Sequence, residues 1–181
     1  GATPVFADID PETYLIDPES VVDRITPRTK AVMPVHIFGN VADIPLLREA
    51  IGPRITIIED AAQAHGSTLR GLKAGTMGDA GVFSFYPTKN LGGYGDGGAA
   101  VVQDPNVAAK PRLLRMYGMV DKDHICMHGV NSRLDELQAA VLRIKLPHLD
   151  EMNRRRIRIA DRYARELPSG LFRPQKVSPD V

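Results

Sequence analysis

The chain has 181 residues, 43% of them hydrophobic and 25% charged, which is enough for one sizeable core or slightly more than one domain. Its 23 basic and 22 acidic residues leave a formal net charge of +1, so composition gives no argument for nucleic acid or an anionic membrane as a partner. The single cysteine excludes an intramolecular disulfide framework and favours a reducing, cytoplasmic location, and no apolar run approaches the roughly 20 residues of a membrane-spanning helix.

The first part of the chain alternates apolar runs with helix signals. Asp17-Pro18-Glu19 predicts a helix from residue 18 to about 25, and Asp43 predicts a capped helix over 44–51. Five apolar runs are strand candidates: 4–9, 30–38, 55–60, 80–86 and 98–104. Strands that alternate with short helices predict an α/β fold with a mostly parallel central sheet.

The last part of the chain is predicted to be helical. Ser132 fits a capping box that leads into "LDELQAAVLRIKL", and a basic helix is expected over 149–166. Apolar residues recur in the first of these helices at helical spacing: Leu134, Leu137, Val141 and Ile144. The expected organisation is a core over 1–130, a helical extension over 131–167 and a loose tail over 168–181.

A glycine-rich stretch follows one lysine, Lys89. Gly93, Gly95 and Gly98 match the spacing of a dinucleotide-binding fingerprint, but an apolar run follows them where that fingerprint requires a helix. Because the lysine precedes the glycines, a phosphate-binding nucleotide loop is excluded as well. The glycines then indicate either a tight turn with positive φ or a loop that lets a planar ligand approach Lys89.

Polar residues stand at the ends of two predicted strands. Asp60 ends an isoleucine-rich strand, where open α/β sheets bind ligands, and could bind a metal, act as a base, pair with a cationic ring nitrogen or cap a helix. Ser84 ends the next strand and could bind a phosphate oxygen or be satisfied by the backbone. The "DHICMH" stretch at 123–128 lacks firm ligand spacing, so no metal site is predicted. An amine, a strand-end carboxylate and a hydroxyl are together the parts of a pyridoxal phosphate site.

Three segments resemble the sugar aminotransferases of the DegT/DnrJ/EryC1/StrS family, which are fold-type I pyridoxal phosphate enzymes. They are "IIEDAAQAHGS", "GDAGVFSFYPTKNLGGYGDGGAAV" and "GVNSRLDELQAAVLRIKLPHLD". The resemblance implies the large domain of that fold, followed by long helices. It also implies that Lys89 links covalently to the cofactor and that Asp60 pairs with the pyridine nitrogen. Gln63 is expected at the ring hydroxyl and Ser84 at the phosphate.

The resemblance also implies a homodimer with a shared site, because Asn131 matches an asparagine that reaches the cofactor phosphate of the neighbouring subunit. From its position alone, Asn131 could equally be a helix-entry residue beside Ser132. His65 and Tyr86 are expected to flank the site. His36 is expected to be a buried, hydrogen-bonded histidine, which the resemblance places near the cofactor edge.

The activity implied is transfer of an amino group from glutamate or glutamine to a nucleotide-linked keto-deoxysugar. Relatives that replace the lysine with histidine are dehydratases, so Lys89 favours transamination. Family members are roughly twice this length, beyond the single-domain range, so the chain is expected to be an internal fragment that lacks a preceding segment and the small domain. The alternatives are a pyridoxal phosphate-dependent dehydratase and an inactive cofactor-binding or dimer-interface fragment.

Overall fold

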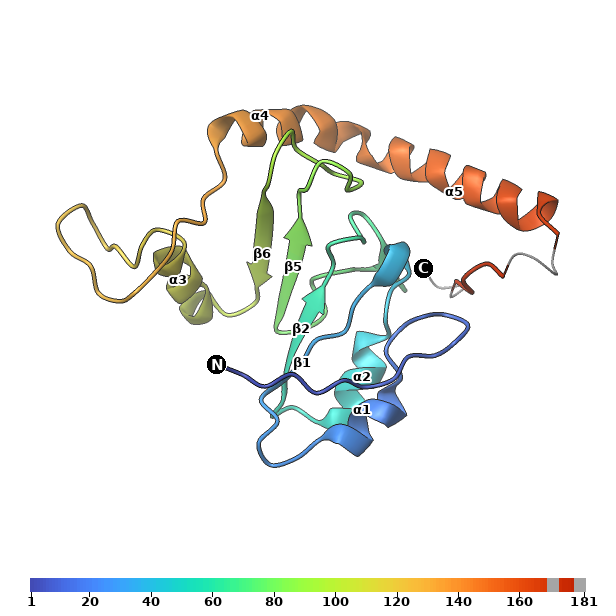
Figure 1. Cartoon of the computed structure of the whole chain (residues 1–181), viewed down its shortest axis with the longest axis horizontal. Helices are drawn as coiled ribbons and strands as arrows, with labels where there is room; N and C mark the ends of the chain where they lie inside the picture. Colours follow the sequence, from blue (N-terminus) through green and yellow to red (C-terminus); the bar gives the residue numbers. More distant parts are fainter. Residues whose placement is uncertain (169–172, 178–181) are drawn as a thin grey trace.

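The computed structural model of the protein describes residues 1–168 and 173–177. Figure 1 shows a sheet in the middle of the molecule, with two short helices at its lower end and two helices in line across its upper end. One further segment, between the sheet and the upper helices in the sequence, projects to the left.

The main sheet has four strands, in the order β1 (Ala31–Val32), β2 (Thr56–Asp60), β5 (Ala80–Ser84) and β6 (Gly98–Val102). The pairs β1–β2 and β2–β5 are parallel, and β5–β6 is antiparallel. Parallel neighbours need a crossover connection, and α2 (Ile44–Ile51) lies in the one between β1 and β2. The expected α/β fold with a mostly parallel sheet is therefore confirmed.

The helices are α1 (Pro18–Arg24), α2 (Ile44–Ile51), α3 (Pro105–Leu114), α4 (Glu136–Lys145) and α5 (Leu149–Glu166), with single 3-10 turns η1 (Ile37–Gly39) and η2 (Leu146–His148). Four of the α-helices, α1, α2, α4 and α5, were predicted, and their presence is confirmed. The Asp17 side chain accepts a hydrogen bond from the Glu19 N–H, and that of Asp43 accepts one from the Leu46 N–H. Gly52 ends α2 with a φ of 75°, a conformation that glycine adopts without strain.

Two strand predictions fail at the amino-terminal side. Residues 4–9 form no strand apart from one bridge between Ile9 and Ile16. In the 30–38 run only β1 is regular, because Pro34 has no N–H to continue the ladder. Pairing resumes for one residue beyond the proline, where Val35 bridges Asp60.

Two elements had not been predicted from the sequence. A small antiparallel pair, β3 (Thr68–Leu69) and β4 (Leu72–Lys73), turns through Arg70 and Gly71, which both have positive φ. Positive φ at both turn residues matches the right-handed twist of a hairpin. Helix α3 is the second such element, and the Asp104 side chain caps it.

The predicted cap of α4 is wrong. The helix begins at Glu136 behind Asp135, not behind Ser132, and the Asp135 side chain makes no cap hydrogen bond. The predicted apolar face is also only partly buried, since Leu137 and Ile144 are 79% and 71% exposed. The buried leucine of this helix is instead Leu142.

Three apolar clusters hold the elements together. The largest lies between α1, α2 and the sheet and is built on Val21, Ala42, Ile44, Leu47 and Ile57. A second cluster fills the turns between β2 and β5 and contains Val41, Ala61, Ala64, Leu69 and Ala74. The third joins the loop after β5 to α4 and α5 through Leu91, Leu142 and Leu149. The clusters therefore fix both ends of β2 and β5.

Residues 175 and 176, in the predicted tail, hydrogen-bond to the amino-terminal part of the chain. The Lys176 N–H donates to the carbonyl of Glu12 at 2.8 Å, and the Gln175 amide donates to that of Thr13. Residues 169–172 and 178–181 lie outside the described part of the chain. The division into core, extension and tail stays a prediction.

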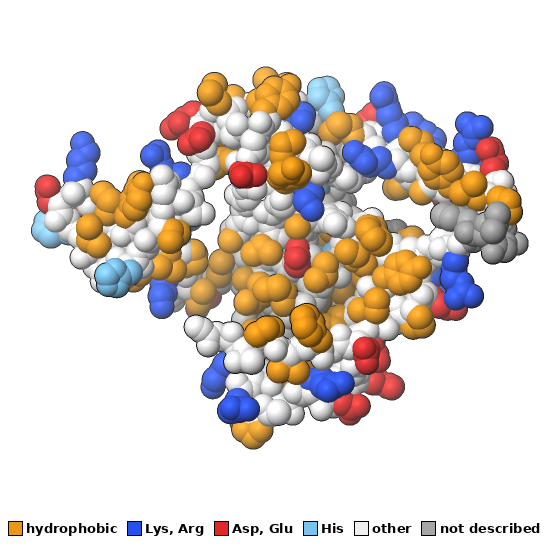
Figure 2. All heavy atoms as spheres, in the orientation of Figure 1, with side chains coloured by type: hydrophobic (Ala, Val, Ile, Leu, Met, Phe, Trp, Pro, Cys, Tyr) orange, Lys and Arg blue, Asp and Glu red, His pale blue; other side chains and the backbone are white. Residues whose placement is uncertain are grey.

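The surface carries many apolar side chains. Figure 2 shows them gathered across the middle of the face seen in Figure 1. Exposed large apolar residues include Val5, Phe6 and Val101. Among the described residues, no helix combines the length and the apolar composition needed to cross a membrane.

Candidate functional site

The predicted site residues Asp60 and Ser84 lie at the carboxyl ends of neighbouring parallel strands. Asp60 ends β2 and pairs in register with Val82 of β5, two residues before Ser84. Because side chains alternate between the two faces of a strand, Asp60 and Ser84 share one face of the sheet. This edge is where open α/β sheets place their ligands.

Asp60 is held on both sides by the segment after β1. Its N–H donates to the Pro34 carbonyl at 2.9 Å, and its own carbonyl accepts from the His36 N–H at 3.0 Å. One carboxylate oxygen accepts from the Ala62 N–H at 3.0 Å, in a turn and not in a helix, so Asp60 is no helix cap. The other oxygen makes no hydrogen bond to any residue that the structure describes. The backbone is fixed while one oxygen stays available.

Polar atoms that could bind a ligand are also found on Gln63, Ser84 and Lys89. The Gln63 side-chain oxygen accepts from the Phe38 N–H at 2.9 Å, and its amide N–H groups make no hydrogen bond to the residues that the structure describes. The Ser84 hydroxyl accepts from the Tyr86 N–H at 3.3 Å and keeps its own hydrogen to donate. Lys89 sits in the loop that follows, where its N–H donates to the Tyr86 carbonyl at 2.9 Å. Within the described residues its ammonium makes no ion pair.

His65 is a buried residue whose pKa is affected by the charge of Lys89. It is 4% exposed, its ring lies 5.5 Å from that of Phe83, and neither ring nitrogen makes a hydrogen bond of ordinary geometry to the described residues. Burial lowers the pKa of His65, and the positive charge of Lys89 lowers it further, against an opposing effect of the Ser84 backbone. Phe83 and Ser84 are neighbours in β5, so their side chains point to opposite faces of the sheet. Because His65 contacts Phe83, it lies on the face opposite to Asp60 and Ser84. It therefore lies behind the site, whereas Tyr86 is 51% exposed beside it.

A buried network supports the end of β2 from behind. His36 and Glu59 are both fully buried, and the His36 Nε2 lies 2.8 Å from a Glu59 oxygen. Since the His36 Nδ1 accepts from the Ala42 N–H, the ring hydrogen is on Nε2 and donates to Glu59. The Glu59 carboxylate also accepts from the N–H groups of Gly75 and Gly78, among others.

The same network explains the ionisation of Glu59. Burial alone would raise the pKa of this carboxyl, but the hydrogen bonds from His36, Gly78 and Gly75 outweigh it and lower the pKa. His36 is thus the buried, hydrogen-bonded histidine that was predicted. It reaches Glu59, next to Asp60, and has no solvent-exposed surface of its own.

The glycine-rich loop is shaped by protein packing. None of the glycines from 92 to 98 has a positive φ, so the turn explanation is wrong. A Cβ on Gly93 would lie 2.7 Å from the Gln138 oxygen of α4, and one on Gly97 would lie 2.9 Å from Leu134. The glycines let the loop approach α4 closely, which explains them without any ligand.

Asn131 lies in the segment that follows α3. It forms an antiparallel bridge with Met116, and its side chain is exposed. No hydrogen bond joins it to β2 or β5 within the described residues. In the nearby "DHICMH" stretch, His124 pairs with Asp121 at 2.7 Å, and the residues that the structure describes contain no group of three or more potential metal ligands.

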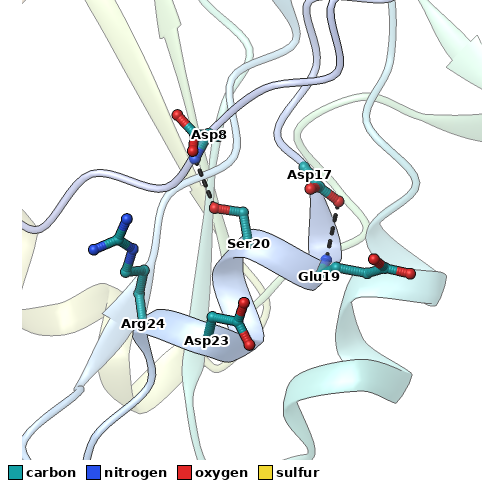
Figure 3. A pocket seen from close by; sticks show the side chains of 6 residues that line it. All are labelled: Asp8, Asp17, Glu19, Ser20, Asp23 and Arg24. Atoms are coloured by element: carbon teal, nitrogen blue, oxygen red, sulfur yellow. Dashed lines mark hydrogen bonds between the residues drawn. The ribbon is translucent and has the colours of Figure 1, made fainter.

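An open hollow lies elsewhere, beside α1 (Figure 3). Its volume is about 480 Å³. Its lining residues are Asp8, Asp17, Glu19, Ser20, Asp23 and Arg24. Two of its polar contacts belong to local structure, since Ser20 accepts from the Asp8 N–H and Asp17 caps α1. These polar contacts of the hollow are therefore explained by the local structure at the start of α1.

Two asparagines near the lysine had not been singled out from the sequence. The Asn90 side chain, next to Lys89, donates to the side-chain oxygen of Asn153 in α5 at 2.8 Å. Asn153 in turn donates to the His65 carbonyl at 2.7 Å. An asparagine in a basic helix gives no local signal of such a role, because both partners are distant in the sequence.

The fold and the candidate site together define an α/β protein in which the carboxyl ends of the parallel strands form the edge where such folds bind ligands. The model of the DegT/DnrJ/EryC1/StrS aminotransferase family matches residues 1–179, and the chain belongs to this family. This confirms the resemblance found in the sequence.

Individual relatives are similar over nearly the whole chain. It is 50% identical over 165 residues to a dTDP-3-amino-3,4,6-trideoxy-alpha-D-glucose transaminase of Micromonospora megalomicea, covering 90% of this chain and 44% of the relative. It is 50% identical over 169 residues to the EryC1 protein of Saccharopolyspora erythraea, covering 92% and 46%. The solved structure of DesV from S. venezuelae superposes with a TM-score of 0.91 at 48% identity, covering 99% of this chain and 49% of DesV. The chain spans about half the length of the curated relatives it matches.

Proposed function

We propose that the protein carries the lysine half of a pyridoxal phosphate site and serves in the transfer of an amino group to a nucleotide-linked keto-deoxysugar. The family and the names of relatives support this, since they include dTDP-sugar and UDP-sugar aminotransferases. The observation that carries the proposal is that Asp60 and Ser84 share one face at neighbouring strand ends, and the chain runs from Ser84 directly into the Lys89 loop.

The polar atoms left unused at this edge fit the cofactor in kind. The free Asp60 oxygen suits a cationic ring nitrogen, the Gln63 amide suits the ring hydroxyl, and the Ser84 hydroxyl suits a phosphate oxygen. Lys89 supplies the primary amine for a covalent link. When bound, pyridoxal phosphate supplies an electron sink for charge that develops at the carbon bearing the amino group.

The chain's own residues then have separate tasks. Asp60 holds a positive charge on the ring nitrogen, and its backbone hydrogen bonds to residues 34 and 36 keep it in place. Lys89 acts as the base and acid that takes and returns a proton at its Nζ. The proposed amino donor is glutamate or glutamine, and the proposed location is the cytoplasm, which suits a chain whose one cysteine is a free thiol.

The covalent role of Lys89 is tested by titrating the protein with pyridoxal phosphate and reducing the product with borohydride. We expect an absorbance band that Lys89→Ala abolishes, and peptide mass mapping should place the reduced label on Lys89. The exposed lysine variant Lys73→Ala is the control and should keep the band. A band unchanged in Lys89→Ala, or a label mapped to another lysine, would refute the role.

The same preparation separates the alternative functions. Glutamate and glutamine are added separately to the loaded protein, and one of them should yield its keto acid, 2-oxoglutarate or 2-oxoglutaramate, in an amount stoichiometric with the cofactor if the protein is a transaminase. Cofactor binding without either keto acid would favour the dehydratase or the inactive binding fragment. Of these two, only the dehydratase would consume a nucleotide-linked deoxysugar.

We further propose a homodimer in which the segment 115–133 meets the second subunit. Figure 1 shows this segment projecting from the sheet, and Asn131 lies in it with an exposed side chain. Val120 and Ile125 are 64% and 68% exposed there. Sedimentation velocity should show a dimer that the double substitution of Val120 and Ile125 by aspartate converts to a monomer, whereas Lys122→Asp should not. A dimer that survives the double substitution would contradict this interface.

A further inference from the structure

The loop that carries Lys89 is fastened to the helices above it by side chains. Lys145 of α4 donates to the Gly92 carbonyl at 2.7 Å, and Gln138 accepts from the Tyr94 N–H at 2.7 Å. Leu91, in the same loop, is buried against α4 and α5. These contacts hold the loop to the helices but do not reach the strand that bears Asp60.

Asn153 of α5 makes the contact that does join the two parts of the site. Its side-chain oxygen accepts from the Asn90 amide at 2.8 Å, one residue from Lys89. Its side-chain nitrogen donates to the His65 carbonyl at 2.7 Å, just beyond the turn that begins at Asp60. Because oxygen and nitrogen are both engaged, the orientation of the amide is fixed.

The surroundings leave this side chain little room to move. A Cβ on Gly66 would lie 3.0 Å from the Asn153 side-chain nitrogen, so the backbone beyond His65 comes close to the amide. Gly66 itself has a φ of 86°. Glycine is the residue that permits this backbone conformation and this approach together.

The anchoring of α5 does not depend on this amide. Leu149 is buried in the third apolar cluster, and Met152 packs against that cluster. Loss of the Asn153 side chain would therefore leave the helix docked and remove only the link between the loop and the turn. That makes the residue a candidate for positioning and not for general stability.

We propose that Asn153 is a positioning residue that fixes the Lys89 loop relative to the turn following Asp60. The proposal rests on the proposed function for its meaning, since the two groups placed are those that would bind the cofactor. It names a role for α5 that is separate from the chemistry at Lys89. The link itself can be measured in the protein without cofactor.

The first test is hydrogen exchange by mass spectrometry on Asn153→Ala without cofactor. The peptide over 85–97 contains amides protected within the loop, such as Gly93, which donates to the Phe85 carbonyl at 2.8 Å. We expect exchange in this peptide to rise by about tenfold, while exchange over β2 stays unchanged. Arg156→Ala, an exposed residue of the same helix with no ion pair among the described residues, is the control and should change neither peptide.

The second test is the dissociation constant for pyridoxal phosphate, measured by absorbance. A loop that samples other positions binds with an affinity reduced by the fraction of time it is correctly placed, so we expect the constant to rise by about tenfold in Asn153→Ala. Asn90→Ala removes only the loop end of the bridge and should reproduce both effects. The double substitution should add nothing to either single one, because both break the same link.

Three results would overturn the proposal. One is that Asn153→Ala has the same exchange rate over 85–97 and the same dissociation constant for pyridoxal phosphate as the unsubstituted protein. Another is a rise in exchange over every peptide, which would mean that Asn153 serves global stability. If Asn153→Ala fails to fold, Asn90→Ala repeats the test with α5 unchanged. The third is full additivity in the double substitution. A selective exchange effect with no cofactor link at Lys89 would instead uphold the bridge and refute the proposed function.

Discussion

The carboxylate of Glu59 offers the sharpest test of how the end of β2 is held. It is fully buried and accepts hydrogen bonds from His36 Nε2 and from the N–H groups of Gly75, Met77 and Gly78, at distances between 2.5 and 2.8 Å. Glu59→Ala would leave these donors without their acceptor. The loss of such a network belongs to the small class of strongly destabilising substitutions.

The magnitude follows from the number of donors. Each buried donor left unsatisfied costs about 1–3 kcal/mol, but part of this is recovered because the turn around residues 75–78 can relax and admit water. We expect the free energy of unfolding to fall by about 4 kcal/mol, a large fraction of the roughly 5–15 kcal/mol typical of a domain. For a chain of this size that corresponds to a melting temperature lower by about 8–16 °C.

Thermal unfolding followed by circular dichroism at neutral pH measures this loss. Glu59→Gln keeps one acceptor oxygen but turns an N–H group toward a donor, so it should cost about half as much. Glu49→Ala, an exposed glutamate on α2, should stay within about 0.5 kcal/mol of the unsubstituted protein. A loss below about 1 kcal/mol for Glu59→Ala would refute the reasoning, since a network of this kind cannot be removed so cheaply.

Two further predictions concern the loop and the buried histidine. Gly93→Ala should lower the free energy of unfolding by about 1–2 kcal/mol in urea titrations, because its Cβ would displace the Gln138 oxygen. Combining it with Gln138→Ala should lower this free energy by less than the sum of the two single effects. Strict additivity would contradict the clash. His65 has a pKa below its ordinary value of 6.5, so below pH 6.5 the unfolded chain binds a proton that the folded chain does not, and stability should fall with pH down to the folded pKa. His65→Phe should reduce the change of the urea midpoint with pH over that range. An unchanged dependence on pH would exclude the buried neutral histidine as its cause.

The sequence predicted those elements whose signals are local. Asp43 and Gly52 mark the two ends of α2 because a cap and a positive φ are properties of single residues. Helix α5 is also found over the whole predicted range. The ends of β2 and β5 could also be placed, and with them Asp60 and Ser84 on a common edge.

The remaining features depend on partners far away in the sequence. The apolar run at 4–9 looks like a strand, but no neighbouring strand pairs with it in the described part of the chain. The close neighbour of Gly93 lies on α4 and that of Gly97 just before it, and the proposed role of Asn153 needs both Asn90 and His65. Such roles are set by packing, which neither periodicity nor propensity reports.

The antiparallel pairing of β5 with β6 has a consequence for the order of assembly. Consecutive strands that pair directly close a short loop, whereas β1, β2 and β5 pair only after longer crossovers, which cost more entropy before any contact forms. The hairpin that presents the amine can therefore form early and locally during synthesis. The carboxylate joins it only once the slower parallel pairs have come together.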